Sequence, residues 1–219
     1  EFLRQRFFQQ INRVRMENLR SRISPHFTFN VLGREINQFN GSEEVKHNLM
    51  ELVKYLRRSL ELTEKLSVSL QDELDFVRTY IELERGRVGE DFVAIITVED
   101  GLDATRIMIP SMIVQIPVEN AIKHGLAGKD GKKELMVYVS RETNGIRITV
   151  TDNGRGYLPQ VVSATRGTGT GLKVLYQTIQ LLNTKNKSDK IRFNITNRSD
   201  GQTGTEVSVY IPFRFSYDL

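Results

Sequence analysis

The spacing of apolar residues changes near residue 90, and this change limits what the chain can fold into. Over residues 45–60, apolar side chains recur every three or four positions, which is typical of an amphipathic helix. After the change, β-branched runs of alternating polarity predict strands at 92–98, 135–139, 146–150, 191–195 and 207–211. We expect helices between these strands, at 110–124 and 171–183. The sequence therefore predicts an α+β chain in which helices come first and a mixed α/β region follows.

These patterns divide the chain into three expected parts: a basic segment at 1–23, a helical domain at 24–90 and a mixed domain at 91–219. Expected helices begin behind the N-capping serines Ser24, Ser42 and Ser69. The first part carries six arginines and a heptad-like apolar spacing. A solvated helix with an arginine-rich face and a dimeric signalling helix fit it equally well, and a stretch beside a membrane segment also fits.

The composition excludes several classes of protein. Of the 219 residues, 39% are hydrophobic and 26% are charged, as in an ordinary globular protein. No apolar run is long enough to span a bilayer, and the lack of cysteine excludes disulfides and thiolate metal sites. A net charge of +4, without a platform of interleaved aromatic and basic residues, does not favour nucleic-acid binding. Because the chain starts at Glu1 rather than Met, we expect it to be a fragment.

Three segments in a fixed order carry the chemistry of the mixed domain. The first is the helix-like run 109–125, in which Gln115, Glu119 and Lys123 share one stripe, four residues apart. Asn120 and His124 form a parallel stripe on the same run. Two glycine clusters follow, Asp152-Asn-Gly-Arg-Gly156 and Gly167-Thr-Gly-Thr-Gly171. Glycine permits close approach of the backbone to a ligand, and free N–H groups there suit phosphate, so the trio predicts a nucleotide site with a metal.

These segments resemble the N box and the two glycine boxes of the GHKL superfamily of ATP-binding proteins, which contains gyrase and the histidine kinases. The helical region extends the likeness, because Arg22-Ile-Ser-Pro-His-Phe-Thr-Phe-Asn30 is similar to the phosphoacceptor motif of LytS-type sensor histidine kinases. Leu56-Arg-Arg-Ser-Leu60 and the acidic segment from Glu73 to Glu84 also match that family, and the match runs from about residue 17 to 213. Ser24 and Thr28 are mild departures from the family motif.

The resemblance implies that His26 takes the γ-phosphoryl group of ATP. Asn30 lies one helical turn after His26, so its amide can orient one ring nitrogen. Glu119 is expected to act either as the base that deprotonates the imidazole or as an acidic residue that contacts the ligands of the metal rather than the metal itself. His47, which lies among charged residues, is expected to be an ordinary surface histidine.

For the pocket, the resemblance implies that Asn120 binds Mg²⁺ through its amide oxygen and that Lys123 and His124 lie near the phosphates. A salt bridge from Lys123 to Glu119 is also expected and is compatible with that role. Asp152 is implied to accept a hydrogen bond from the adenine amino group, and Thr205 to help hold adenine through water. The other positions implied to line the nucleotide are Gly154, Gly156, Gly167, Thr168, Gly169, Gly171 and Leu172.

The expected fold is therefore a helical-hairpin dimerisation and phosphoacceptor domain followed by an α/β sandwich of the Bergerat type. The expected function is that of a two-component sensor histidine kinase, which uses ATP and Mg²⁺ and passes phosphate to an aspartate of a response regulator. Pairing the hairpin 17–62 with a second copy would complete a four-helix bundle, so we expect a homodimer. We expect the cytoplasmic portion of a bacterial inner-membrane protein, tethered only through a segment outside this chain. A kinase-inactive ATP-binding scaffold and a serine kinase of the anti-sigma type are the alternatives.

Overall fold

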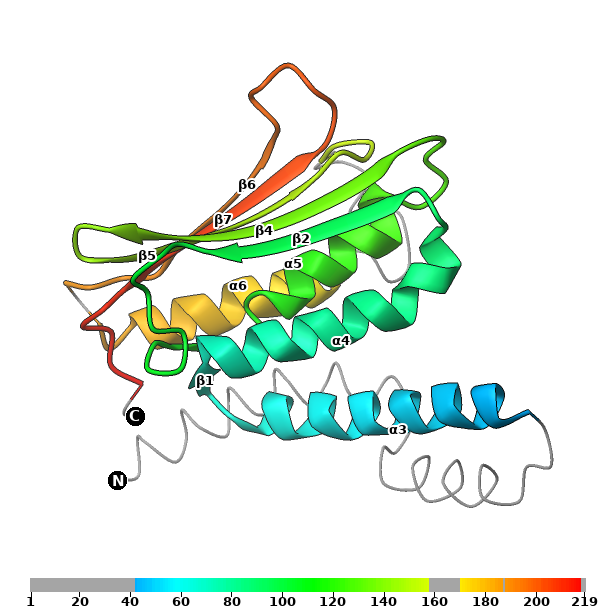
Figure 1. Ribbon diagram of the computed structural model, residues 1–219. Helices are drawn as coiled ribbons and strands as arrows, with labels where there is room; N and C mark the ends of the chain where they lie inside the picture. Colours follow the sequence, from blue (N-terminus) through cyan, green and yellow to red (C-terminus); the bar gives the residue numbers. More distant parts are fainter. Residues whose placement is uncertain (1–41, 158–169, 187, 218–219) are drawn as a thin grey trace. The chain divides into compact units, whose positions relative to one another are not determined.

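The computed structural model describes residues 42–157, 170–186 and 188–217 (Figure 1). The predicted site residues His26, Asn30, Gly167, Thr168 and Gly169 lie outside these ranges. The chain divides into two compact units, Glu1–Leu66 and Ser67–Leu219. No helix within the described ranges has both the length and the apolar character needed to cross a membrane.

The described part of the first unit is one long helix, α3 (Glu43–Glu64). It begins as predicted behind Ser42, whose side chain accepts a hydrogen bond from the backbone N–H of Val45 at 3.4 Å. Pairs of opposite charge three residues apart, such as Lys54 with Glu51 at 2.7 Å, support its polar side. Its apolar side is partly exposed, because Val45 and Leu52 keep 43% and 38% of their surface accessible.

The second unit is built on a five-stranded sheet with the strand order β2-β4-β5-β7-β6. The strands are β2 (Phe92–Val98), β4 (Lys133–Glu142), β5 (Gly145–Asp152), β6 (Arg192–Asn197) and β7 (Thr205–Pro212). The β2–β4 pair is parallel and the other pairs are antiparallel. A small second sheet pairs β1 (Ser67–Ser69) with β3 (Met108–Pro110). This topology brings the end of β5 beside the start of β7, where the predicted adenine-binding residues lie.

Three helices cover one face of the large sheet (Figure 1). They are α4 (Leu70–Val88), α5 (Gln115–Asn120) and α6 (Thr170–Asn183). A π-helical turn, η1 (Ala121–Gly125), continues α5. The helix α4 begins as predicted behind Ser69, whose side chain accepts a hydrogen bond from the backbone N–H of Asp72 at 3.0 Å.

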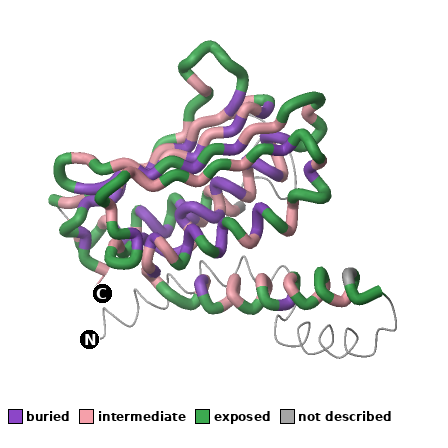
Figure 2. The backbone as a smooth tube through the Cα atoms, viewed as in Figure 1, coloured by how far each residue is buried: buried purple, intermediate pink, exposed green. Residues whose placement is uncertain are grey.

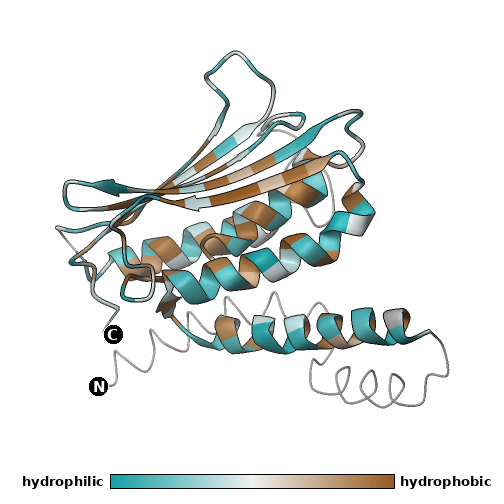
Figure 3. Ribbon diagram, viewed as in Figure 1, coloured by the Kyte–Doolittle hydropathy of each residue, from teal (hydrophilic) through white to brown (hydrophobic). Residues whose placement is uncertain are grey.

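The core lies between these helices and the sheet. Alternate strand residues turn inward, so the buried positions in the tube view concentrate where helix and sheet face each other (Figure 2). The same facing surfaces are apolar in the hydropathy view (Figure 3). The fully buried side chains include Leu70 and Leu74 of α4, Leu135 of β4, and Ile146 and Ile148 of β5. The apolar face of the sheet is buried against the apolar stripes of the helices. The strand and helix patterns in the sequence therefore produce a layer of strands and a layer of helices.

All five predicted strands are present, but the helix predicted at 110–124 begins later than expected. Pro110 still belongs to β3, and Met112 adopts a left-handed backbone with φ of 69°, which a helix cannot contain. The helix begins only at Gln115, and the last turn widens into the π-helical form. The strands β1 and β3, each of three residues, were not predicted.

The boundary between the compact units also differs from the predicted domain boundary at 90–91. The difference is due to α4, whose buried residues Leu74, Val77 and Ile81 pack in the second unit. Periodicity shows that a helix has an apolar stripe but not which neighbour covers it. The division into functional domains at 24–90 and 91–219 stays a prediction.

Candidate functional site

Asp152, at the last position of β5, is a carboxylate held in a buried place. Only 4% of its surface is accessible, and its Oδ1 accepts hydrogen bonds from the backbone N–H of Gly154 at 2.8 Å and of Thr205 at 3.4 Å. Burial raises the pKa of Asp152 above its ordinary value, although these hydrogen bonds act in the opposite direction. Both backbone donors reach Oδ1, so within the described residues Oδ2 receives no backbone hydrogen bond. The site therefore contains a fixed acceptor at a strand end.

Glycines allow three chain segments to converge on Asp152. A Cβ atom on Gly125 would lie 2.8 Å from Oδ1 of Asp152, and one on Gly154 would lie 2.1 Å from the carbonyl oxygen of Gly125. Gly204 has φ of 138°, and a Cβ atom there would lie 1.9 Å from the carbonyl oxygen of Asp152. All three approaches are closer than any side chain permits, so these positions require glycine.

Gly125 and Gly204 were not among the predicted site residues, although each adjoins one of them: Gly125 follows His124, and Gly204 precedes Thr205. Asn197 of β6 was also missed. Its Oδ1 accepts a hydrogen bond from the backbone N–H of Tyr157 at 2.6 Å. It thereby holds the chain just after Gly156, which has φ of 85°. No signal in the sequence relates Asn197 to the glycine cluster, because the two are far apart along the chain.

The predicted stripe along α5 and η1 is confirmed. Glu119 accepts a hydrogen bond from the side-chain amide of Gln115 at 3.1 Å, through Oε1. Its Oε2 pairs with the ammonium group of Lys123 at 2.8 Å. The ammonium group also lies 5.8 Å from the ring centre of Tyr80, a residue of α4. Glu119 and Lys123 thus form a partly buried ion pair with fixed geometry on the helix that carries Asn120.

Asn120 and His124 occupy the neighbouring stripe. The side-chain Nδ2 of Asn120 donates to the carbonyl oxygen of Ile116 at 2.7 Å. This hydrogen bond uses the donor end of the amide, so the acceptor end, Oδ1, is the atom that can serve a cation. The pKa of His124 is below its ordinary value, first because of burial and then because of the positive charges of Lys123 and Arg155. A neutral imidazole is therefore favoured at this place.

Arg155 connects the first glycine cluster to the α5–η1 helix, a role that the sequence did not reveal. Its side-chain Nε donates to the carbonyl oxygen of His124 at 2.7 Å, and its backbone N–H donates to that of Gly125 at 3.2 Å. These two carbonyl groups are available because they lie at the end of η1, where the last carbonyl groups have no partner within the helix.

The start of α6 lies against α5. A Cβ atom on Gly171 would lie 3.3 Å from Cγ2 of Ile116, so the first turn of α6 packs closely on the helix that carries Asn120. Leu172 is half-buried at the next position. The structure thus brings together the described members of all three predicted segments. Their individual roles toward a ligand stay predictions.

A metal ion here would depend on few protein ligands. Within the described residues, no group of three or more His, Cys, Asp or Glu side chains is arranged to hold a metal. The amide oxygen of Asn120 is an acceptable ligand for Mg²⁺, which normally keeps several waters and binds phosphate oxygens. The donor set therefore fits a Mg²⁺ ion that arrives with a nucleotide, and does not fit a resident metal held by protein alone.

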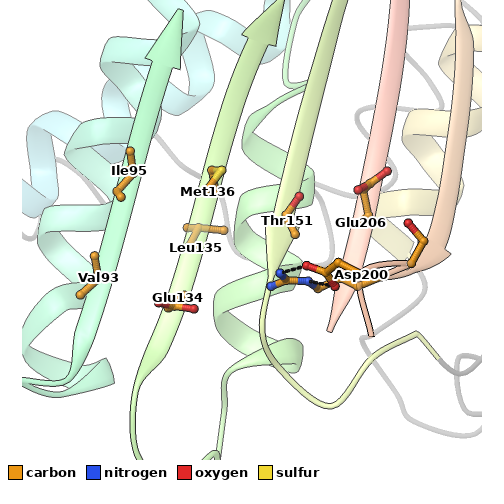
Figure 4. Close-up of a pocket in the computed structure, with 10 residues that line it drawn as sticks. Val93, Ile95, Glu134, Leu135, Met136, Thr151, Asp200 and Glu206 are labelled. Atoms are coloured by element: carbon orange, nitrogen blue, oxygen red, sulfur yellow. Dashed lines mark hydrogen bonds and ion pairs between the residues drawn. The ribbon is translucent and has the colours of Figure 1, made fainter. Parts of the chain in front are cut away.

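A separate cavity of about 350 Å³ lies on the face of the sheet away from the helices (Figure 4). Val93 and Ile95 of β2 and Met136 of β4 form its apolar floor. The ion pair between Arg198 and Asp200 closes one end. None of its lining residues, all in the described part of the chain, is a predicted site residue. Thr151 faces this cavity, whereas the next residue, Asp152, is buried on the side of the helices, so the cavity and the site lie on opposite faces of the sheet.

Comparison with known proteins points in the same direction as the geometry. A family model described as histidine kinase matches residues 14–92. A second, described as histidine kinase-, DNA gyrase B- and HSP90-like ATPase, matches residues 106–214.

Two curated relatives are similar over most of the chain. The sensor histidine kinase YpdA of Escherichia coli is 28% identical over 93% of this chain and 35% of its own length. The sensor histidine kinase/phosphatase LytS of Staphylococcus aureus is 32% identical over 86% of this chain and 33% of its own length. The chain therefore spans about a third of the length of these relatives.

Among solved structures, the histidine kinase domain of a blue-light-activated histidine kinase from Erythrobacter litoralis has a similar fold. The superposition has a TM-score of 0.51 at 16% identity and covers 97% of this chain and 95% of that one. At this identity the likeness concerns the fold alone, which is the α+β arrangement expected from the sequence.

Proposed function

The chain belongs to the GHKL-type histidine kinase family, and from this premise we propose that it is the kinase portion of a two-component sensor kinase. It binds ATP with Mg²⁺ in the site around Asp152 and transfers the γ-phosphoryl group to His26. The phosphoryl group then passes to an aspartate on the receiver domain of a response regulator. The observation that carries the proposal is the convergence of Gly125, Gly154 and Gly204 on a buried carboxylate.

We assign recognition of adenine to Asp152 and Thr205. A buried carboxylate presents only acceptors, so it suits the exocyclic amino group of adenine and disfavours a carbonyl at the same position. Thr205 contributes its backbone N–H to the same carboxylate and places its hydroxyl beside it, where a water can bridge to the base. Gly154 and Gly156 supply the space that a planar base needs.

We assign the phosphate end to Asn120, Lys123 and His124, together with Gly167, Thr168, Gly169, Gly171 and Leu172. Bound Mg²⁺ would neutralise charge on the phosphate oxygens, and the amide oxygen of Asn120 would hold it. Lys123 adds a positive charge, and its ion pair with Glu119 fixes where that charge lies. The backbone N–H groups at the start of α6 suit phosphate oxygens.

In the transfer itself, a ring nitrogen of His26 attacks the γ-phosphorus, the bond to the β-phosphate oxygen breaks, and ADP leaves. We assign the displaced imidazole proton to Glu119, whose two oxygens are oriented by Gln115 and Lys123. Asn30 is proposed to orient the imidazole so that the attacking nitrogen carries its lone pair. Because phosphohistidine is a high-energy linkage, a relay to an aspartate suits the product.

We propose that the active form is a homodimer assembled through the helical unit. The exposed apolar residues Val45 and Leu52 of α3 would be covered when two hairpins form a four-helix bundle. Since ATP and receiver domains are available in the cytoplasm, we place this portion of the protein on the cytoplasmic side of a bacterial membrane.

The test is incubation of purified protein with γ-labelled ATP and Mg²⁺, comparing wild type with His26→Gln. We expect an acid-labile label on wild type and none on the variant. His47→Gln is the matched control, because His47 is an exposed histidine of α3 and its loss should leave labelling unchanged. Label that survives His26→Gln would overturn the assignment of His26. Nucleotide binding without any labelling would instead indicate a kinase-inactive scaffold.

A further inference from the structure

Glu73 is a buried carboxylate that none of the proposed roles uses. It lies on α4, none of its surface is accessible, and it accepts three backbone hydrogen bonds from the chain just before α5 and at its start. Its Oε2 accepts from Met112 N at 2.8 Å, and its Oε1 accepts from Val114 N at 2.7 Å and from Gln115 N at 3.3 Å. A carboxyl group with no accessible surface is tolerated only with such partners, so Glu73 and the start of α5 depend on each other.

The backbone that Glu73 holds is unusual. Met112 is the one residue other than glycine, within the described ranges, whose φ is positive, at 69°. Such a conformation persists only where the surroundings impose it, and positions of this kind are frequent at functional sites. The hydrogen bond from Met112 N to Glu73 therefore fixes the point at which the chain leaves β3 and turns into α5.

A continuous series of contacts leads from Glu73 to the ion pair at the phosphate end. Glu73 accepts from the backbone N–H of Gln115, and the side chain of Gln115 donates to Glu119 at 3.1 Å. Glu119 then pairs with Lys123 at 2.8 Å. Asn120 follows Glu119 directly, so any shift at the start of this short helix displaces the proposed metal ligand as well.

We propose that Glu73 is a positioning residue for phosphoryl transfer, which holds α5 so that Glu119, Asn120 and Lys123 face the phosphates. The inference rests on the proposed function and adds to it a residue that touches neither nucleotide nor metal. Adenine recognition depends on it less, because Asp152 and Thr205 belong to the sheet. The segment that reaches Asp152 is the far end of η1, at Gly125, and not the start of α5 that Glu73 holds. Glu73 should therefore affect the transfer rate much more than the affinity for the base.

The experiment compares wild type with Glu73→Gln. The side-chain NH₂ group of the glutamine would face a backbone N–H group, so one of the hydrogen bonds to Glu73 would be replaced by two donors facing each other. Two quantities are measured on folded protein well below its melting temperature: the affinity for ADP without Mg²⁺, by calorimetry, and the labelling rate at saturating Mg-ATP. We expect the rate to fall about 10- to 100-fold, as for small misplacements of reacting groups, and the ADP affinity to change less than about threefold. The control is Glu82→Gln, an exposed acid of the same helix, which should match wild type.

The outcomes separate the two proposals. A wild type that binds no ADP would defeat the proposed function itself. A wild type that binds and is labelled, beside a Glu73→Gln protein labelled at the same rate, would overturn the positioning role alone. Equal losses of rate and ADP affinity would assign Glu73 a general structural role and would also overturn it.

A second variant covers the case in which Glu73→Gln does not fold. Gln115→Ala keeps the backbone N–H groups that donate to Glu73 and removes the side-chain amide that orients Glu119. We expect the same selective loss of rate, and an unchanged rate would overturn the inference. Combining Gln115→Ala with Glu119→Gln should give less than the product of the two single effects, because both act through one carboxylate.

Discussion

Replacing Gly154 with alanine tests whether the site depends on close contact between the first glycine cluster and the η1 turn. The added Cβ atom would lie 2.1 Å from the carbonyl oxygen of Gly125 and 2.8 Å from Oδ1 of Asp152. The first contact is with backbone, which cannot rotate away as a flexible side chain would. To relieve the clash, the two segments must separate by roughly 1 Å. The substitution therefore overpacks a site that is already tightly packed.

The cost has two parts. Overpacking of this kind costs about 1–3 kcal/mol. In the wild type, Arg155 N donates to the carbonyl oxygen of Gly125 at 3.2 Å. Separation of the two segments also breaks this hydrogen bond, which contributes about 1 kcal/mol. The sum is about 3 kcal/mol, and for a unit of this size it lowers the melting temperature by about 6–12 °C. Because Asp152 is displaced in the process, the affinity for adenine nucleotides should fall by at least about tenfold.

The assay is thermal unfolding together with calorimetric titration of ADP. Gly86→Ala is the matched control, because Gly86 lies inside α4 and a Cβ atom there would meet nothing within 4 Å. It should raise the stability by up to about 1 kcal/mol, through helix propensity, and leave binding unchanged. If Gly154→Ala melts and binds ADP as wild type does, the reasoning about this contact is refuted.

Further predictions concern Asp152 and the start of α4. In Asp152→Asn, an amide NH₂ group replaces the carboxylate oxygen that accepts from the adenine amino group. Adenine-nucleotide affinity measured by calorimetry should therefore fall by roughly 10- to 150-fold. An unchanged affinity would contradict adenine recognition by this carboxylate. Since burial raises the pKa of Asp152, wild-type stability should decline relative to Asp152→Asn as the pH rises from 3.8 through the folded-state pKa, and then stay constant. Urea unfolding of both proteins across this range would show it, and a difference that grows in favour of wild type would refute it. Ser69→Ala removes the cap that accepts from Asp72 N at 3.0 Å and should lower the free energy of unfolding by about 1 kcal/mol, without changing nucleotide affinity.

The sequence by itself determined the order and kind of most elements, because these depend on local chemistry. Side-chain alternation is sufficient to identify strands such as β2 and β5, since a strand exposes every second residue on one face. The caps at Ser42 and Ser69 were predictable because each bonds an N–H only three residues away. The ion pair of Glu119 with Lys123 followed from their spacing of four residues on a helix.

Only the tertiary structure decided how these elements combine into a site. The contact of Thr205 with Asp152 joins residues 53 apart in the chain, and that of Glu73 with Val114 joins residues 41 apart. No local pattern records such pairs, because they form only when separate elements pack against one sheet. The same holds for the late start of α5, where a carboxylate from another helix holds Met112 in a conformation that the local sequence does not favour. Local propensity therefore identified the elements, and long-range packing positioned the acceptor, the glycines and the ion pair relative to one another.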